Sequence, residues 1–158
     1  MTVTDSFNFT LPTSKNEDFI NKHSTSSLVI ATYNAKLIIG YNNWRQQWEF
    51  PAGKREHADK DCYDTAQREF FEETHLISEN LRLVGLITIS KPNQSTRYRA
   101  IFLDNLTYFT PFTQQIGDEM AKLALFPSSE LTTLNIDAGD LAIYHRLQKE
   151  GLLNVHLP

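Results

Sequence analysis

The chain has 158 residues, of which 41% are hydrophobic and 22% are charged, a composition typical of a globular domain and not of a disordered or fibrous protein. The net charge of −4 argues against binding of long nucleic acid, whereas a small phosphorylated ligand could still bind through divalent cations. The apolar runs are too short to cross a membrane, and the N-terminus lacks the pattern of a signal peptide. The single cysteine, Cys62, allows no internal disulfide, so we expect a cytoplasmic protein.

The first part of the chain predicts a polar arm followed by a β-hairpin. Residues 1–25 carry no clear hydrophobic period, and only Phe7–Leu11 resembles a strand. Two β-rich runs follow, Ser27–Tyr33 and Lys36–Tyr41, separated by a short turn that contains Asn34. Two such runs around a short turn are typical of a hairpin.

The middle of the chain predicts a loop, a helix and two strands. Pro51-Ala52-Gly53 is a loop signal. A helix is expected over Asp61–Thr74, with Asp61 as its N-cap. Two strands are then expected over Leu81–Ser90 and Tyr98–Phe109.

The last part of the chain predicts a loop, a strand and two helical segments. A loop over Gln114–Met120 precedes a short strand over Lys122–Phe126. Pro127–Leu131 resembles the start of a helix, with one of its two serines as the cap. A terminal helix is expected over Asp140–Glu150, ended by Gly151.

Strands mixed with two or three helices predict an α/β (α+β) fold, in which a mixed sheet is covered on both sides by helices. The sequence contains no internal repeat, low-complexity tract or linker. We therefore expect one domain over residues 1–158, with an N-terminal arm at 1–25 and a C-terminal helix at 140–151. A fold class of this kind does not by itself identify a function.

The expected helix at 61–74 carries three carboxylates on one face. Because each residue turns the helix by about 100°, Glu69, Glu72 and Glu73 fall within one turn. The adjoining face is apolar and can pack on a sheet: it carries Tyr63, Ala66 and Phe70. Two carboxylates about 6 Å apart repel each other by on the order of 3 kcal/mol at an effective dielectric constant near 20.

Either water or a divalent cation can relieve this repulsion. A solvated acidic face is the commoner arrangement for an isolated cluster of acids. If a cation binds, hard carboxylate oxygens favour Mg²⁺ or Mn²⁺, and the lack of a His/Cys cluster argues against zinc. Arg68, which precedes the first carboxylate, could hold one of them by a charge-assisted hydrogen bond.

The segment 53–76 resembles the Nudix box, a pattern of spaced glycine, arginine and glutamate residues. The matching positions, once one extra residue is allowed between Asp59 and Arg68, are Gly53, Arg68, Glu69, Phe70, Glu72, Glu73 and Leu76. Three positions depart from the family pattern. Asp59 stands where the family has glutamate, the extra residue falls within Lys60–Asp64, and His75 replaces a glycine that commonly ends the helix.

The resemblance implies an α/β/α sandwich and a pyrophosphohydrolase that uses Mg²⁺ or Mn²⁺ to cut the diphosphate linkage of a nucleotide. By resemblance, the metal ligands would be Glu69, Glu72, Glu73 and the backbone carbonyl of Ala52. A carboxylate of this group, or Glu119 in a later loop, would remove a proton from the attacking water. A surface acid with no catalytic role is an equally good interpretation of Glu119.

The resemblance leaves two substrate classes open. The layout of the whole chain resembles bacterial nucleoside triphosphatases that act on oxidised nucleotides such as 8-oxo-dGTP, whereas the Pro-Ala-Gly lead-in resembles ADP-ribose pyrophosphatases. Candidate base-contacting residues are Trp44, Trp48, Phe109 and Asp118. Candidate phosphate-contacting residues are Lys54, Arg55, Arg97 and Arg99. Core packing for the aromatic residues, and ordinary surface charge for the basic ones, are the alternatives.

Three classes of function therefore compete. The first is a metal-dependent enzyme that acts on a small nucleotide, and the intact Arg-Glu-x-x-Glu-Glu core favours it. The second is a Nudix-derived module that binds a nucleotide without cutting it, which the changes at Asp59 and His75 favour slightly. The third is a structural domain with an acidic helix. A homodimer could form through the terminal helix, and neither a membrane nor long nucleic acid is expected as a partner.

Overall fold

The computed structural model describes residues 7–113 and 119–153. The chain divides into two compact units, one formed by residues 1–30 and 51–104 and the other by 31–50 and 105–158. Each unit combines β-strands with helices, which confirms the expected α/β class. Within the described residues, no helix is both long and apolar enough to cross a membrane.

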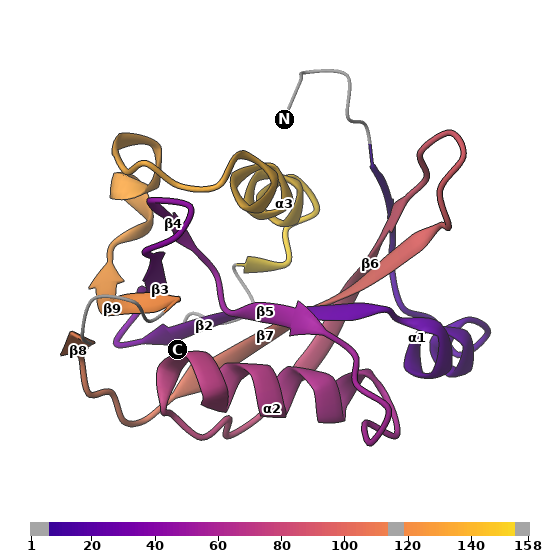
Figure 1. The fold of residues 1–158 in the computed structure, drawn as a ribbon, viewed down its shortest axis with the longest axis horizontal. Helices are drawn as coiled ribbons and strands as arrows, with labels where there is room; N and C mark the ends of the chain where they lie inside the picture. Colours follow the sequence, from indigo (N-terminus) through magenta and orange to yellow (C-terminus); the bar gives the residue numbers. More distant parts are fainter. Residues whose placement is uncertain (1–6, 114–118, 154–158) are drawn as a thin grey trace. The chain divides into compact units, whose positions relative to one another are not determined.

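The first unit contains a sheet and two helices (Figure 1). Its elements in chain order are β1 (Asn8–Thr10), α1 (Glu17–His23), the first part of β2 (Ser26–Tyr33), β5 (Ala52–Lys54), α2 (Cys62–Thr74), β6 (Arg82–Ile89) and most of β7 (Arg97–Leu106). Strand β1 pairs with β6, β6 with β7, and β2 with β5, all in antiparallel register. Thr25 and Ser26 bond to Tyr98 and Arg99 in the same order, so β2 runs parallel to β7 and the sheet is mixed.

The second unit is built around β3 (Lys36–Asn42). Its other elements are the end of β2, β4 (Gln47–Glu49), β8 (Phe112–Thr113), β9 (Met120–Phe126), the 3₁₀ helix η1 (Ser128–Thr133) and α3 (Ala138–Lys149). Strand β3 pairs antiparallel with β2, β4 and β9, and β9 pairs with β8. The carboxylate of Asp137 caps α3 by accepting the amide of Asp140 at 2.9 Å.

The expected hairpin is confirmed. Tyr33 pairs with Lys36, so the connection has two residues, Asn34 and Ala35, and both have positive φ angles, 50° and 63°. A two-residue connection of this type matches the right-handed twist of the strands that it joins. The strands expected around β6 and β7, and the terminal helix followed by Gly151 with a φ of 73°, are also present.

The polar arm contains a helix that the sequence did not predict. Residues 1–25 were expected to form a loose arm with one strand, but α1 occupies Glu17–His23. The helix places acidic residues in its first turn and basic residues in its last, which suits the helix dipole. It buries one residue, Ile20, so its seven residues show too little hydrophobic period to be recognised from the sequence.

Two local predictions were wrong. Pro51-Ala52-Gly53 was expected to be a loop, but Ala52 and Gly53 belong to β5, and the carbonyl of Pro51 accepts the amide of Val29 at 2.8 Å. A serine was expected to cap the helix after Pro127, but Pro127 itself occupies the cap position without a side-chain bond, and the turn is 3₁₀. The loop expected at Gln114–Met120 falls largely outside the described residues, and Met120 begins β9.

Candidate metal and catalytic site

Helix α2 has clear start and stop signals, so the orientation of its carboxylates is fixed. The carboxylate of Asp61 accepts the amide of Asp64 at 2.9 Å, which confirms the predicted N-cap. At the other end His75 adopts the left-handed conformation, with a φ of 60°, and its amide donates to the carbonyl of Phe71 at 2.8 Å. The histidine therefore ends the helix as a glycine would. The buried residues of α2 are Cys62, Thr65, Ala66, Phe70 and Thr74.

Strand β5 lies beside α2 (Figure 1). The carboxylates of Glu69 and Glu73 lie against its backbone. A Cβ atom on Gly53 would lie 1.9 Å from the Cδ atom of Glu69, so this carboxylate approaches the backbone more closely than any other residue at position 53 would allow. The amide of Ala52 donates to Oε2 of Glu73 at 3.4 Å. The glycine of the box thus creates the space that Glu69 occupies.

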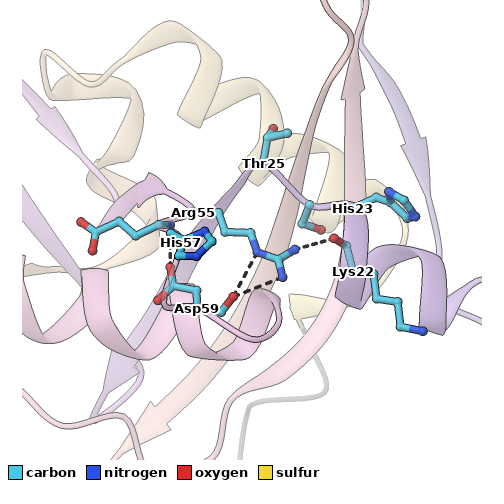
Figure 2. A pocket seen from close by; sticks show the side chains of 8 residues that line it. Lys22, His23, Thr25, Arg55, His57 and Asp59 are labelled. Atoms are coloured by element: carbon cyan, nitrogen blue, oxygen red, sulfur yellow. Dashed lines mark hydrogen bonds between the residues drawn. The ribbon is translucent and has the colours of Figure 1, made fainter.

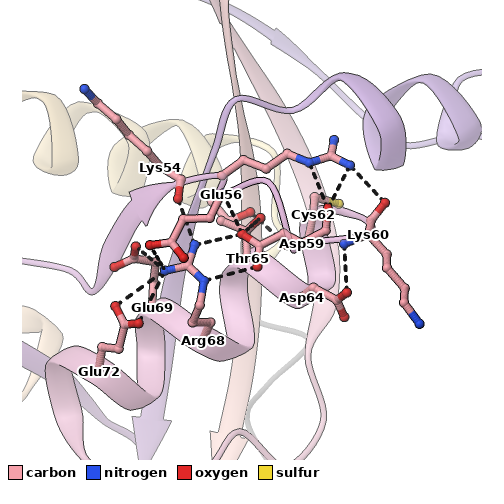
Figure 3. Close-up of polar contacts among 12 residues, drawn as sticks. Lys54, Glu56, Asp59, Lys60, Cys62, Asp64, Thr65, Arg68, Glu69 and Glu72 are labelled. Carbon is pink, nitrogen blue, oxygen red and sulfur yellow. Dashed lines mark hydrogen bonds and ion pairs between the residues drawn. The ribbon is translucent and has the colours of Figure 1, made fainter.

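Arg68 connects the acidic side chains of the box (Figure 3). Its Nη1 atom lies 2.8 Å from Oε1 of Glu69, 3.4 Å from Oε2 of Glu72 and 3.2 Å from Oε1 of Glu56. Three carboxylates, those of Glu56, Glu69 and Glu72, therefore share one positive charge, which offsets part of the repulsion between them. This contact confirms the prediction that Arg68 holds a carboxylate by a charge-assisted hydrogen bond.

The other side of the Arg68 guanidinium is bound by Asp59. Nε and Nη2 donate to the two oxygens of this carboxylate at 3.1 and 2.7 Å, the bidentate geometry that suits arginine. Asp59 is buried and also accepts from the amide of Glu56 and the hydroxyl of Thr65. These donors, Arg68 foremost, hold the pKa of Asp59 well below its ordinary value, and Asp59 in turn raises the pKa of Arg68.

Glu69 occupies a different electrostatic environment from Asp59. Burial disfavours its charged form and raises its pKa, although the hydrogen bond from Arg68 acts in the opposite direction. A carboxylate with a raised pKa accepts a proton more readily near neutral pH than an ordinary glutamate does. The site therefore combines one strongly ionised acid, Asp59, with one acid whose proton affinity is increased.

The donor set fits a hard divalent cation, but the described residues do not gather three His, Cys, Asp or Glu side chains into a ready metal site. Glu69 and Glu72 bind the guanidinium of Arg68 instead. The available donors are carboxylate oxygens and backbone carbonyls, which are the ligands that Mg²⁺ and Mn²⁺ prefer. Since Gly53 leaves room for a carboxylate against the backbone of β5, the residues fit a metal of this class.

A pocket of about 510 Å³ lies next to the loop that precedes α2 (Figure 2). The residues that line it are Lys22, His23, Ser24, Thr25, Arg55, Glu56, His57 and Asp59. Nη2 of Arg55 donates to the carbonyls of Asp59 and Lys60 at 3.2 and 2.9 Å, and Nη1 donates to the carbonyl of Lys22. All three nitrogen atoms of the Arg55 guanidinium thus donate to the protein backbone. The side chain of Lys54 extends away from Arg68 (Figure 3).

In the second unit, Glu119 belongs to a polar network. Its carboxylate accepts from the side chain of Asn42 at 3.4 Å and lies 3.7 Å from Nη2 of Arg45. Glu49, which sequence reasoning missed, is 15% exposed and accepts from Asn42 at 2.9 Å and from Gln47 at 2.7 Å. No periodic pattern marks these residues, because they lie on the end of β3, the following turn, β4 and the position just before β9.

The candidate base-contacting residues have different surroundings. Trp48 packs edge-on against Tyr41 and Phe126, with ring centroids 5.3 and 4.8 Å apart. Phe109 stacks on Tyr33 at 6.0 Å. Trp44 is 66% exposed. Asp118 lies outside the described residues.

Comparison with known proteins identifies the family. The model of the NUDIX domain matches residues 23–147. The fold is similar to that of a Bacillus subtilis pyrophosphohydrolase, RppH, at 17% identity and a TM-score of 0.66, over 92% of this chain and 90% of that one. It is also similar to the Nudix domain of NrtR from Shewanella oneidensis, solved with ADP ribose, at 10% identity and a TM-score of 0.67, over 84% and 91% of the two chains.

A third similar structure is a MutT protein from Bacillus halodurans, at 21% identity and a TM-score of 0.60, over 76% of this chain and 78% of that one. No curated protein sequence matches the chain. These structural similarities concern the fold, whereas the family match spans most of the sequence and confirms the expected Nudix hydrolase. The chain therefore belongs to the NUDIX domain family.

Proposed function

We propose that the chain is a pyrophosphohydrolase that uses Mg²⁺ or Mn²⁺ to cut the diphosphate linkage of a small nucleotide. One observation carries the proposal: α2 and β5 bring the carboxylates of Glu69 and Glu73 against the backbone of Ala52 and Gly53. We assign Glu69, Glu72 and Glu73, with the carbonyl of Ala52, as the metal ligands. A bound divalent cation would neutralise phosphate oxygens and lower the pKa of the attacking water.

The remaining residues would set the protonation and position of these ligands. Arg68 would orient Glu69 and Glu72, while Asp59 would keep Arg68 in place. Two groups are candidates for accepting the proton of the attacking water. Glu69 has a raised pKa, and Glu119 is held by Asn42 and Arg45.

As substrate we propose a nucleoside triphosphate, including oxidised forms such as 8-oxo-dGTP, cleaved to the monophosphate and pyrophosphate. The whole-chain resemblance to bacterial triphosphatases and the similarity to a MutT protein support this choice. The second candidate is ADP-ribose, which is favoured by the similarity to an NrtR domain solved with that ligand. Of the residues assigned to the base and the phosphates, Trp48, Asp118 and Lys54 stay candidates, while the guanidinium of Arg55 binds backbone carbonyls.

The proposal is tested by incubating the protein and Mg²⁺ with triphosphates, dinucleotides and nucleotide sugars, and by identifying the products. Release of pyrophosphate from a triphosphate is expected, and AMP from ADP-ribose would select the second candidate. Glu72→Gln and Glu73→Gln should each lower kcat by about 100-fold or more while the circular dichroism spectrum is unchanged. Nucleotide binding without turnover of any compound would leave a binding module as the function.

Two further expectations are proposals about the protein as a whole. We propose that it acts in the cytoplasm on free nucleotides, without a nucleic acid or membrane partner. A homodimer could form through α3. Light scattering during size-exclusion chromatography measures the mass of the protein in solution. A mass of one chain would exclude the dimer.

A further inference from the structure

Arg55 differs from the other basic residues near the site in what its guanidinium binds. Nε and Nη2 donate to the carbonyl of Asp59 at 3.4 and 3.2 Å, Nη2 also donates to the carbonyl of Lys60 at 2.9 Å, and Nη1 donates to the carbonyl of Lys22. Among the described residues, no carboxylate lies within ion-pair distance of Arg55. All three of its nitrogen atoms are therefore used to hold backbone (Figure 2).

These three carbonyls belong to two different segments. Lys22 lies in the last turn of α1, whereas Asp59 and Lys60 lie in the loop before α2. Relative to the family pattern, this chain has one extra residue between Asp59 and the helix. A longer loop has more conformations to lose on folding. Arg55 fixes the loop at its two consecutive carbonyls and ties it to the end of α1.

Arg55 holds the backbone of Asp59, and the side chain of Asp59 binds Arg68. The carboxylate of Asp59 makes two bonds to Arg68, at 3.1 and 2.7 Å, and Arg68 makes a bond of 2.8 Å to Glu69. A shift of the Asp59 backbone therefore changes the position of the Arg68 guanidinium and, through it, of the Glu69 carboxylate. Displacements of about 1 Å in a catalytic arrangement can lower a rate by about 100-fold.

We propose that Arg55 is a positioning residue of the active site: it holds the loop of Asp59 so that Asp59 orients Arg68 and Arg68 orients Glu69. The effect on turnover rests on the proposed hydrolase function, whereas the effect on Arg68 does not. This role replaces the sequence-based interpretation of Arg55 as a phosphate ligand. Its guanidinium makes four hydrogen bonds, and all four go to backbone carbonyls.

The test compares Arg55→Gln and Arg55→Lys with the unchanged protein. The first readout is the ¹⁵N-NMR signal of the Arg68 Nε–H group in the metal-free protein, which its bond to Asp59 protects from exchange with water. The second is the affinity for Mn²⁺, measured by electron paramagnetic resonance. The third is the separate measurement of kcat and KM for the nucleotide that the protein hydrolyses.

We expect Arg55→Gln to increase the exchange of the Arg68 signal at least tenfold, to weaken Mn²⁺ binding several-fold, and to lower kcat at least tenfold with KM within twofold. Arg55→Lys keeps the charge but cannot span three carbonyls, so it should show the same changes to a smaller extent. Lys22→Gln is the matched control, because Lys22 offers Arg55 only its backbone carbonyl while its side chain pairs with Asp18. It should leave all three readouts unchanged.

A tenfold rise in KM with an unchanged Arg68 signal would overturn the proposal and restore Arg55 as a phosphate ligand. Unchanged values of all readouts in both variants would overturn it as well. If Arg55→Gln does not fold, Arg55→Lys decides the question by the same criteria. If the unchanged protein hydrolyses no nucleotide, the hydrolase function fails, and the Arg68 signal and Mn²⁺ affinity still decide the role of Arg55.

Discussion

Replacement of Gly53 by alanine tests the contact that shapes the proposed metal site. The added Cβ atom would lie 1.9 Å from Cδ and 2.2 Å from Oε2 of Glu69. Carbon atoms in contact are normally about 3.5 Å apart or more, so the Glu69 carboxylate must withdraw by about 1.5 Å. Because the obstructing atoms belong to the end of a flexible side chain, Glu69 can move while the backbone of β5 stays in place.

The size of the expected effect follows from this displacement. A misplacement of about 1 Å can cost about 100-fold in rate, so Gly53→Ala should lower kcat by about 100-fold or more. The cost in stability should be smaller, about 1 kcal/mol, at the low end of the range for overpacking, because the clash is relieved by movement at the end of the Glu69 side chain. Mn²⁺ affinity should fall together with kcat, since the displaced group is one of the proposed ligands.

The control for this experiment is a second glycine variant, one that loses stability but lies away from the proposed metal site. Gly85→Ala provides it, because its Cβ would lie 2.4 Å from the ring of Phe9, on the β1–β6 pair. Pyrophosphate release, Mn²⁺ binding and urea unfolding are measured on both variants. Gly85→Ala should lower the free energy of unfolding and leave kcat unchanged. A Gly53→Ala protein with kcat within threefold of the original would refute the placement of Glu69 in the site.

Two further predictions concern titratable groups. Because Arg68 holds the pKa of Asp59 below its ordinary value of 3.8, Asp59→Asn should cost about 3 kcal/mol of unfolding free energy near neutral pH. That difference between the two proteins should persist down to about pH 5 and shrink as the pH falls below 4, and a difference independent of pH would contradict the ion pair. Burial raises the pKa of the Cys62 thiol to about 12, so Ellman's reagent at pH 8 should react slowly with the folded protein and rapidly in urea. Equal rates would show that Cys62 is accessible.

The parts of the fold with a strong local pattern were predictable from the sequence. The hairpin around Asn34, helix α2 with its Asp61 cap, and strands β6 and β7 all combine a hydrophobic period with clear start or stop residues. The placement of Glu69, Glu72 and Glu73 within one turn of a helix was also predictable, because it depends only on their spacing along α2. Helix α1 was not, since its one buried residue gives no period.

The contacts that support the site were harder to predict, for a physical reason. Arg55 binds backbone carbonyls, and a carbonyl carries no residue-type signal in the sequence. One of them, at Lys22, is 33 residues away from Arg55. The network of Asn42, Arg45 and Glu49 similarly depends on how a turn and two strands place side chains, which no periodic pattern describes.

The departures from the family pattern leave the contact between Asp59 and Arg68 and the start of α2 intact. Asp59 is one methylene shorter than glutamate, and it contacts Arg68 at 2.7 Å. The extra residue does not enter the helix: Asp61 is the cap, Cys62 is the first helical residue, and the amide of Lys60 donates to Asp64 at 2.9 Å. The carboxylates of α2 therefore keep their rotation toward β5. Since Asp59 binds Arg68 through both of its oxygens and the added residue lies outside the helix, neither departure by itself indicates that the site has lost its chemistry.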